Sequence, residues 1–65
     1  MKKRHKIIIQ ALRDLGGKAT LKELSEKTSL HVNGLSQSMY SVGQYVKLKH
    51  LGGKGGEQMY KIIKE

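Results

Sequence analysis

Residues 6–15 carry apolar side chains at the spacing of an amphipathic helix. These positions recur every three or four residues, which places them on one face of the helix: Ile8, Ala11, Leu12 and Leu15. Gly16 and Gly17 follow at once and predict the end of the helix. Ile7 and Ile9 lie partly off this stripe. They either widen the buried face or form a contact between two copies of the chain.

A second, shorter helix is predicted after residue 20. In the segment "TLKE", Thr20 caps the amino end while the Glu23 side chain reaches back to the cap amide, which is the capping-box pattern. Leu21 and Leu24 then face inward. The pattern is interrupted over residues 28–30, and Leu30 is expected to enter the core within that turn.

A third helix is predicted over about residues 31–45. Its buried stripe shows spacings of four, three and four residues: Leu35, Met39, Val42 and Val46. The helix begins at His31 or Asn33, of which asparagine is the better cap. Gly43 either ends the helix or sits inside it. The opposite face is polar and uncharged, with Asn33, Ser36, Gln37, Tyr40, Ser41 and Gln44.

The last third of the chain alternates with a period of two, which indicates strands. The run "YVKLKHL" places Val46 and Leu48 on one face, with Lys47 and Lys49 on the other, and "QMYKII" repeats this alternation. The glycines between the two runs predict the turn of a β-hairpin, with Lys54 at its tip. Residues 18–20 are predicted to add a short third strand beside the hairpin.

The order of these elements is that of the winged helix-turn-helix, in which helices with a tight turn between the second and third are followed by a hairpin, the wing. The sequence therefore predicts an α+β fold. We expect one winged-helix domain over residues 1–65, in which residues 1–5 form a basic tail.

The chain is strongly basic, with 13 Lys or Arg against 5 Asp or Glu and a formal net charge of +8. No formal charge lies between Lys27 and Lys47. This balance favours a polyanionic partner, and double-stranded DNA and RNA share the same electrostatics. The alternative is a basic surface that only increases solubility. The basic clusters are Lys2, Lys3, Arg4 and Lys6 at the amino end, and Lys47, Lys49 and Lys54 in the hairpin.

Several classes of function find no support in the sequence. The chain contains no cysteine, so it forms neither a disulfide nor a thiolate zinc site, and an intracellular location in cytoplasm or nucleus is expected. The amino-terminal apolar run is too short for a signal peptide, and no membrane partner is expected. His5, His31 and His50 fall on separate elements, and the carboxylates lack metal-ligand spacing. Neither an enzyme nor a cofactor is expected.

The segment "LSEKTSLHVNGLSQSMYSV" resembles the helix-turn-helix of MarR-like and ArsR-like winged-helix regulators. In those families a short helix ends with a small residue and a leucine, followed by a polar cap and an apolar-polar-polar repeat. The residues in these places are Ser29, Leu30, His31, Leu35, Met39 and Val42.

This resemblance implies a small transcriptional regulator that inserts its third helix into the major groove of double-stranded DNA. There Gln or Asn pairs with adenine, while basic residues hold phosphates outside. Two copies on adjacent half-sites imply a homodimer, through Ile7, Ile9 or the C-terminal strand. Base-facing residues would be Asn33, Ser36, Gln37, Tyr40 and Gln44, and phosphate-binding residues Lys2, Lys3, Arg4, Lys47, Lys49 and Lys54.

A narrower resemblance is to Z-alpha domains, winged helices that bind left-handed Z-form DNA or RNA. In that family a tyrosine of the recognition helix and an aromatic residue of the last strand pack together against the nucleic acid, and Tyr40 and Tyr60 match them, as do Ser41 and Lys47. The chain departs from the family at four places. Tyr60 replaces the usual tryptophan, Ser36 replaces a phosphate-binding asparagine, Val32 replaces a lysine, and residues 57–58 replace the wing prolines.

A third interpretation is a protein-interaction module. Some winged helices serve as protein-binding domains, and in that case the positive charge would recruit an acidic partner.

Overall fold

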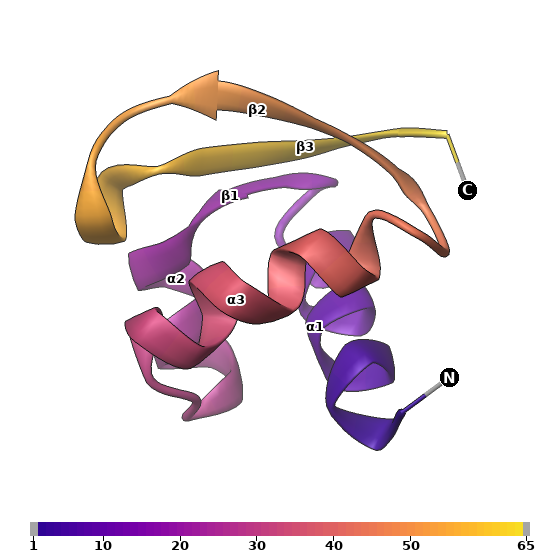
Figure 1. Ribbon diagram of the computed structural model, residues 1–65, viewed down its shortest axis with the longest axis horizontal. Helices are drawn as coiled ribbons and strands as arrows, with labels where there is room; N and C mark the ends of the chain where they lie inside the picture. The colour runs from indigo at the N-terminus through magenta and orange to yellow at the C-terminus, as the bar shows by residue number, and fades with distance from the viewer. Residues whose placement is uncertain (1, 65) are drawn as a thin grey trace.

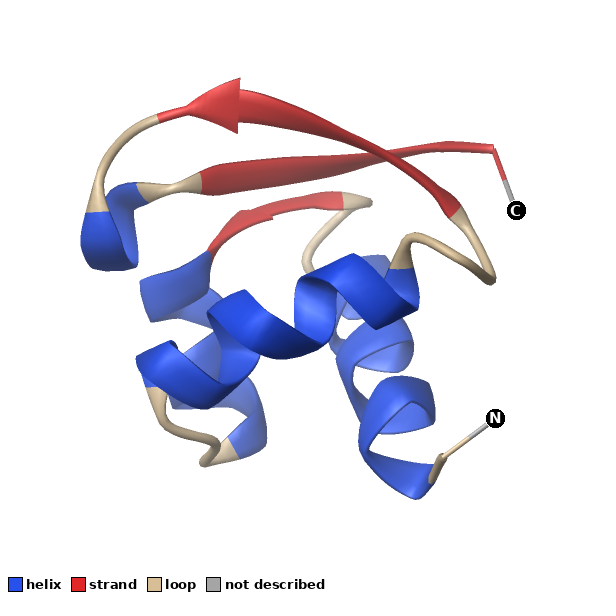
Figure 2. Cartoon of the chain, viewed as in Figure 1, coloured by secondary structure: helices blue, strands red, loops and turns tan. Residues whose placement is uncertain are grey.

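The structure, a computed structural model, describes residues 2–64, and over this range helices lie on one side of a three-stranded antiparallel sheet (Figure 1). The predicted α+β fold with winged-helix topology is confirmed. Met1 and Glu65, which the predicted domain includes, lie outside the described residues. The elements are α1 (Lys3–Asp14), β1 (Lys18–Thr20), α2 (Leu21–Thr28), α3 (Val32–Val42), β2 (Lys47–Gly52), the 3-10 turn η1 (Gly55–Glu57) and β3 (Met59–Lys64) (Figure 2).

Helix α1 begins at Lys3, earlier than the predicted residue 6, so the prediction of a basic tail over residues 1–5 is wrong for residues 3–5. The reason is tertiary. His5 is buried and its ring packs against Tyr45, which fixes the first turn of the helix to the body of the domain. At the other end Gly17 donates a hydrogen bond of 2.7 Å to the carbonyl of Leu12, and the predicted glycine terminus is confirmed.

The capping box that begins α2 is confirmed. The amide of Glu23 donates to the Thr20 hydroxyl (3.1 Å), and the Glu23 carboxylate accepts from the Thr20 amide (2.9 Å). Helix α2 ends at Thr28, and its C-cap Ser29 adopts the left-handed conformation (φ 64°). The turn into α3 is held by the hydroxyl of Ser25, which donates to the carbonyl of Leu30 at 2.6 Å. Leu30 packs against the core from this turn, as predicted.

Helix α3 is capped by His31, so the preference for Asn33 as the cap is wrong. The His31 ring nitrogen Nδ1 accepts the amide hydrogen of Asn33 at 3.1 Å, which satisfies one of the free amides of the first turn. The helix ends at Val42, with Gly43 as its C-cap in a right-handed conformation (φ −62°). Val46 therefore belongs to the segment after the helix, although it is buried as predicted.

The sheet has the order β1-β3-β2, and the predicted short third strand is confirmed. Its register forms two rows, one on each face. Ala19, Tyr60 and His50 lie opposite one another in the row that turns toward the helices, where Ala19 is buried and Tyr60 packs against the core. The neighbouring register positions, Lys18, Lys61 and Lys49, form the row on the outer face. We call these three lysines the outer lysine row.

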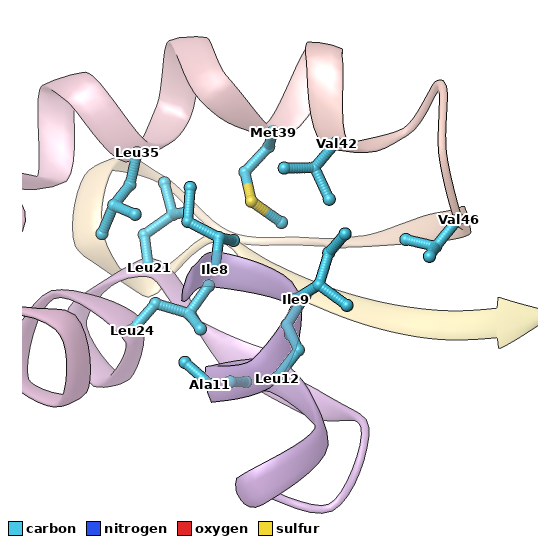
Figure 3. Packing of buried hydrophobic residues seen from close by; sticks show 11 residues of the cluster. Ile8, Ile9, Ala11, Leu12, Leu21, Leu24, Leu35, Met39, Val42 and Val46 are labelled. Carbon is cyan, nitrogen blue, oxygen red and sulfur yellow. The ribbon is translucent and has the colours of Figure 1, made fainter. Parts of the chain in front are cut away.

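The core lies between the helices and the inner face of the sheet (Figure 3). Leu35, Met39 and Val42 project from α3 toward Ile8 and Ile9 of α1. Ile9 is only 4% exposed, so the core interpretation holds for this residue and the prediction that it forms a dimer contact is wrong. Ile7 is 41% exposed.

The glycine-rich connection between β2 and β3 forms the turn of the hairpin, as predicted, and Lys54 is exposed immediately before η1. Gly53 has a φ of +99°, a conformation that side chains rarely adopt, and a Cβ atom built there would collide with the carbonyl group of Glu57. Gly56 differs, because its Cβ would make only an ordinary contact of 3.5 Å with Lys22.

We expect Gly53→Ala to destabilise the domain by about 1–3 kcal/mol, because it adds backbone strain and forces the turn apart. Thermal unfolding should then begin at a temperature lower by at least about 5 °C. Gly56→Ala is the matched control and should leave the unfolding temperature nearly unchanged. Equal effects of the two substitutions would show that the close approach at Gly53 does not hold the hairpin turn.

Candidate nucleic-acid interface

The outward face of α3 is largely exposed to solvent. Asn33, Ser36 and Gln37 are exposed, and Tyr40 is 80% exposed. Gln44 is also exposed, but it lies after the C-cap Gly43, so the predicted extension of the helix to residue 45 is wrong. Ser41 is half-buried. The buried stripe on the other side of the helix holds this face outward, since Leu35 and Val42 are fully buried. The predicted base-facing side chains are therefore available to a partner.

An open groove of about 420 Å³ separates α3 from the hairpin, and we call it the wing groove. Tyr40 and Tyr60 both line it, from the helix and from β3. The Tyr60 ring packs against the His50 ring, with the two ring centroids 4.9 Å apart. The complete lining is Ser36, Met39, Tyr40, Gly43, Gln44, Leu48, His50, Gln58 and Tyr60.

A second open hollow, of about 410 Å³, lies between the start of α1 and α3, and we call it the basic hollow. Lys2 and Arg4 line it from one side, while polar side chains of α3 line it from the other. The complete lining is Lys2, Arg4, His5, Gly34, Gln37, Ser38, Ser41, Gln44 and Tyr45. Gln44 borders both this hollow and the wing groove.

Arg4 lies directly over the first turns of α3. A Cβ built at Gly34 would lie 3.3 Å from the Arg4 Nη2 atom, so the missing side chain leaves room for the guanidinium close to the helix backbone. Arg4 is exposed. A cation in this place can hold a phosphate beside the residues that face the bases.

His5 and Tyr45 both line the basic hollow. Their ring centroids lie 5.9 Å apart, and His5 is only 8% exposed. The His5 Nδ1 atom is buried and has no hydrogen-bond partner among the described residues. The pair ties the start of α1 to the segment that follows α3, and it thereby holds Lys2 and Arg4 beside the helix.

The hairpin lysines lie away from the wing groove. Leu48 and His50 line that groove, so the alternation of the strand turns Lys47 and Lys49 to the outer face of the sheet. Lys54 is exposed at the wing turn, and Lys3 is exposed on α1. The predicted phosphate-binding residues therefore lie in different places: Lys2 and Arg4 share the basic hollow with α3, whereas Lys47 and Lys49 lie on the outer face of the sheet.

Several lining residues were not predicted from the sequence. His50 has the clearest signal, since it stands two positions after Leu48 in an alternating strand and must share its face. Gln58 directly precedes β3. Gly34 and Tyr45 have no comparable signal, because their places depend on how α1 packs against α3.

Comparisons with known protein families, with curated proteins and with solved structures find no match to this chain. Within residues 2–64, no helix is long and apolar enough to cross a membrane. In the same part of the chain, no three His, Asp or Glu side chains gather as ligands for a metal ion.

Proposed function

We propose that this chain is a winged-helix module that binds double-stranded DNA inside the cell, as a small transcriptional regulator. The observation that carries the proposal is the uncharged polar face of α3, which is largely exposed to solvent and is bordered by the cations Lys2 and Arg4. Amide side chains such as Gln37 and Gln44 suit base edges, and the flanking cations suit phosphates.

DNA is favoured over RNA for a geometric reason. The major groove of B-form DNA, about 12 Å wide, admits an α-helix, whereas that of A-form RNA is too deep and narrow for side chains to read. In this arrangement α3 enters the groove and the wing follows the backbone. A homodimer through Ile7, which is half exposed, or through the C-terminal strand stays a prediction.

The salt dependence of duplex affinity tests this proposal. If Lys2, Lys3, Arg4 and Lys54 each neutralise one phosphate, affinity should fall about 150-fold between 50 and 200 mM salt, because the released counterions set the slope. Fluorescence anisotropy with a mixed-sequence duplex measures it. A loss of less than about threefold would contradict a phosphate-binding role for these residues.

Z-form nucleic acid is a second candidate. It is favoured by one observation, that Tyr40 and Tyr60 line the same groove. Circular dichroism of an alternating CG duplex separates the two proposals, since a Z-form binder inverts the spectrum. We expect the spectrum to keep its B-form sign, because Ser36 and Val32 replace the phosphate-binding residues of Z-alpha domains. Inversion would assign the Z-form function instead.

A further inference from the structure

The outer face of the sheet carries a row of like charges. Lys18 of β1, Lys61 of β3 and Lys49 of β2 are direct register partners across all three strands, and all are exposed. Lys47 precedes this row on β2 and is also exposed. Within the described strands no position is Asp or Glu, so no carboxylate in the sheet neutralises the row.

This arrangement is unfavourable for the isolated domain. Side chains directly opposite each other on neighbouring strands lie about 5 Å apart at their Cβ atoms, where like charges destabilise the sheet. Lysine on an edge strand has a known protective role against pairing with other sheets. Lys61 lies on β3, the central strand, so edge protection does not account for it.

The row also faces away from the candidate DNA interface. The helices lie on the other side of the sheet (Figure 1), and the wing groove is lined by His50 and Tyr60, which occupy the inner row. A partner held by the outer lysine row therefore leaves the polar face of α3 free.

We infer that the outer lysine row holds the phosphate backbone of a second nucleic-acid duplex, independently of sequence, so that one molecule joins two duplexes. Strands lie about 4.8 Å apart, so the row spans about 10 Å, and over about 10 Å of helix axis one strand of a duplex carries about three phosphates. Lysine is a flexible point charge, suited to backbone phosphates and not to bidentate base contacts. The joining of two duplexes rests on the function proposed for α3. The binding of phosphates by the outer lysine row does not, because it depends only on the charge of the sheet face.

Lys61→Glu is the decisive variant. It turns two like-charged register pairs into opposite-charged pairs with Lys18 and Lys49, so the domain should unfold at the same or a higher temperature. Loss of duplex joining in this variant therefore cannot come from unfolding. Lys22→Glu is the matched control, because it makes the same change of charge at an exposed position in the first turn of α2, where a carboxylate is favourable.

The assay is retention of a fluorescent duplex on beads that carry a second duplex, bridged by the protein. We expect the wild type and Lys22→Glu to retain the free duplex and Lys61→Glu to retain at least tenfold less. With three phosphates on the row, the affinity for the second duplex should fall about 40-fold between 50 and 200 mM salt. Affinity for a single duplex in protein excess should stay within about threefold in both variants.

Three outcomes would overturn the inference. In the first, the wild-type protein retains no fluorescent duplex on the beads. In the second, Lys61→Glu retains as much fluorescent duplex as Lys22→Glu, and this result would assign the joining to two copies of the chain. In the third, the outer lysine row binds vesicles of anionic phospholipid or an acidic peptide and does not bind the second duplex. Failure of the α3 proposal has a different signature: Lys61→Glu would then abolish binding of even a single duplex, while changes in α3 would have no effect.

Discussion

The double variant Gln37→Ala and Tyr40→Ala is expected to bind double-stranded DNA at least about 30-fold more weakly than the wild type, since each lost base contact removes about 1–3 kcal/mol of binding free energy. Both side chains project from the outward face of α3, and Tyr40 is 80% exposed. Their removal should therefore leave the stability of the domain within about 0.5 kcal/mol per substitution.

Anisotropy titrations with wild type and variant under the same salt conditions measure this loss. Gln10→Ala is the matched control, because it removes an amide from an exposed position on α1, outside both the wing groove and the basic hollow. An unchanged affinity in the double variant would remove α3 from the interface. Binding of an acidic protein partner that survives the double substitution would favour the protein-interaction interpretation.

The Leu35→Ala variant is expected to lose about 3–5 kcal/mol of its free energy of unfolding, because it leaves a cavity where α3 meets the core. Leu35 is fully buried. A domain of this size holds only about 3–10 kcal/mol in total, so much of the population should unfold at 37 °C. This is the largest stability effect that we expect from one substitution.

Urea unfolding followed by circular dichroism measures this effect. Leu51→Ala is the control, since Leu51 is 42% exposed and its truncation should cost less than about 0.5 kcal/mol. Equal midpoints for the two leucine variants would mean that α3 is not anchored by its apolar stripe, and the outward orientation of its polar face would lose its physical basis.

The fold was largely predictable because its signals are local. The capping box of Thr20 and Glu23, the glycines after α1 and the alternation in the hairpin each depend on residues a few positions apart. These signals agree with one another, which is what allows short-range patterns to define a fold. The buried stripe of α3 is also a local signal, because its apolar residues stand three or four positions apart.

Two of the errors concern contacts between elements, and one concerns a local cap. No capping residue precedes Lys3, and α1 extends to it with His5 buried against Tyr45, a residue 40 positions later in the chain. His31 caps α3 although asparagine is the more common cap, and Ile9 enters the core although it lies off the main stripe. Tertiary packing decided the cases of Lys3 and Ile9, whereas the His31 cap is a local hydrogen bond to the Asn33 amide.

The candidate interface was predictable in part. The polar face of α3 follows from helical spacing, and the same alternation that forms the hairpin also separates Lys47 and Lys49 from His50. The cluster of hairpin charges in the sequence suggested one phosphate-binding surface beside α3. The register of the sheet instead places Lys49 in the outer lysine row, away from the basic hollow that Lys2 and Arg4 line.

An NMR titration of the nitrogen-15-labelled protein with a mixed-sequence 12-base-pair duplex tests the central claim most directly. We predict that the largest shifts fall on the amides of residues 33–44 and on Lys2, Arg4 and His50, and that they shrink at higher salt. Unmoved amides throughout α3, with shifts confined to other parts of the chain, would contradict the claim that this helix is the surface that contacts DNA.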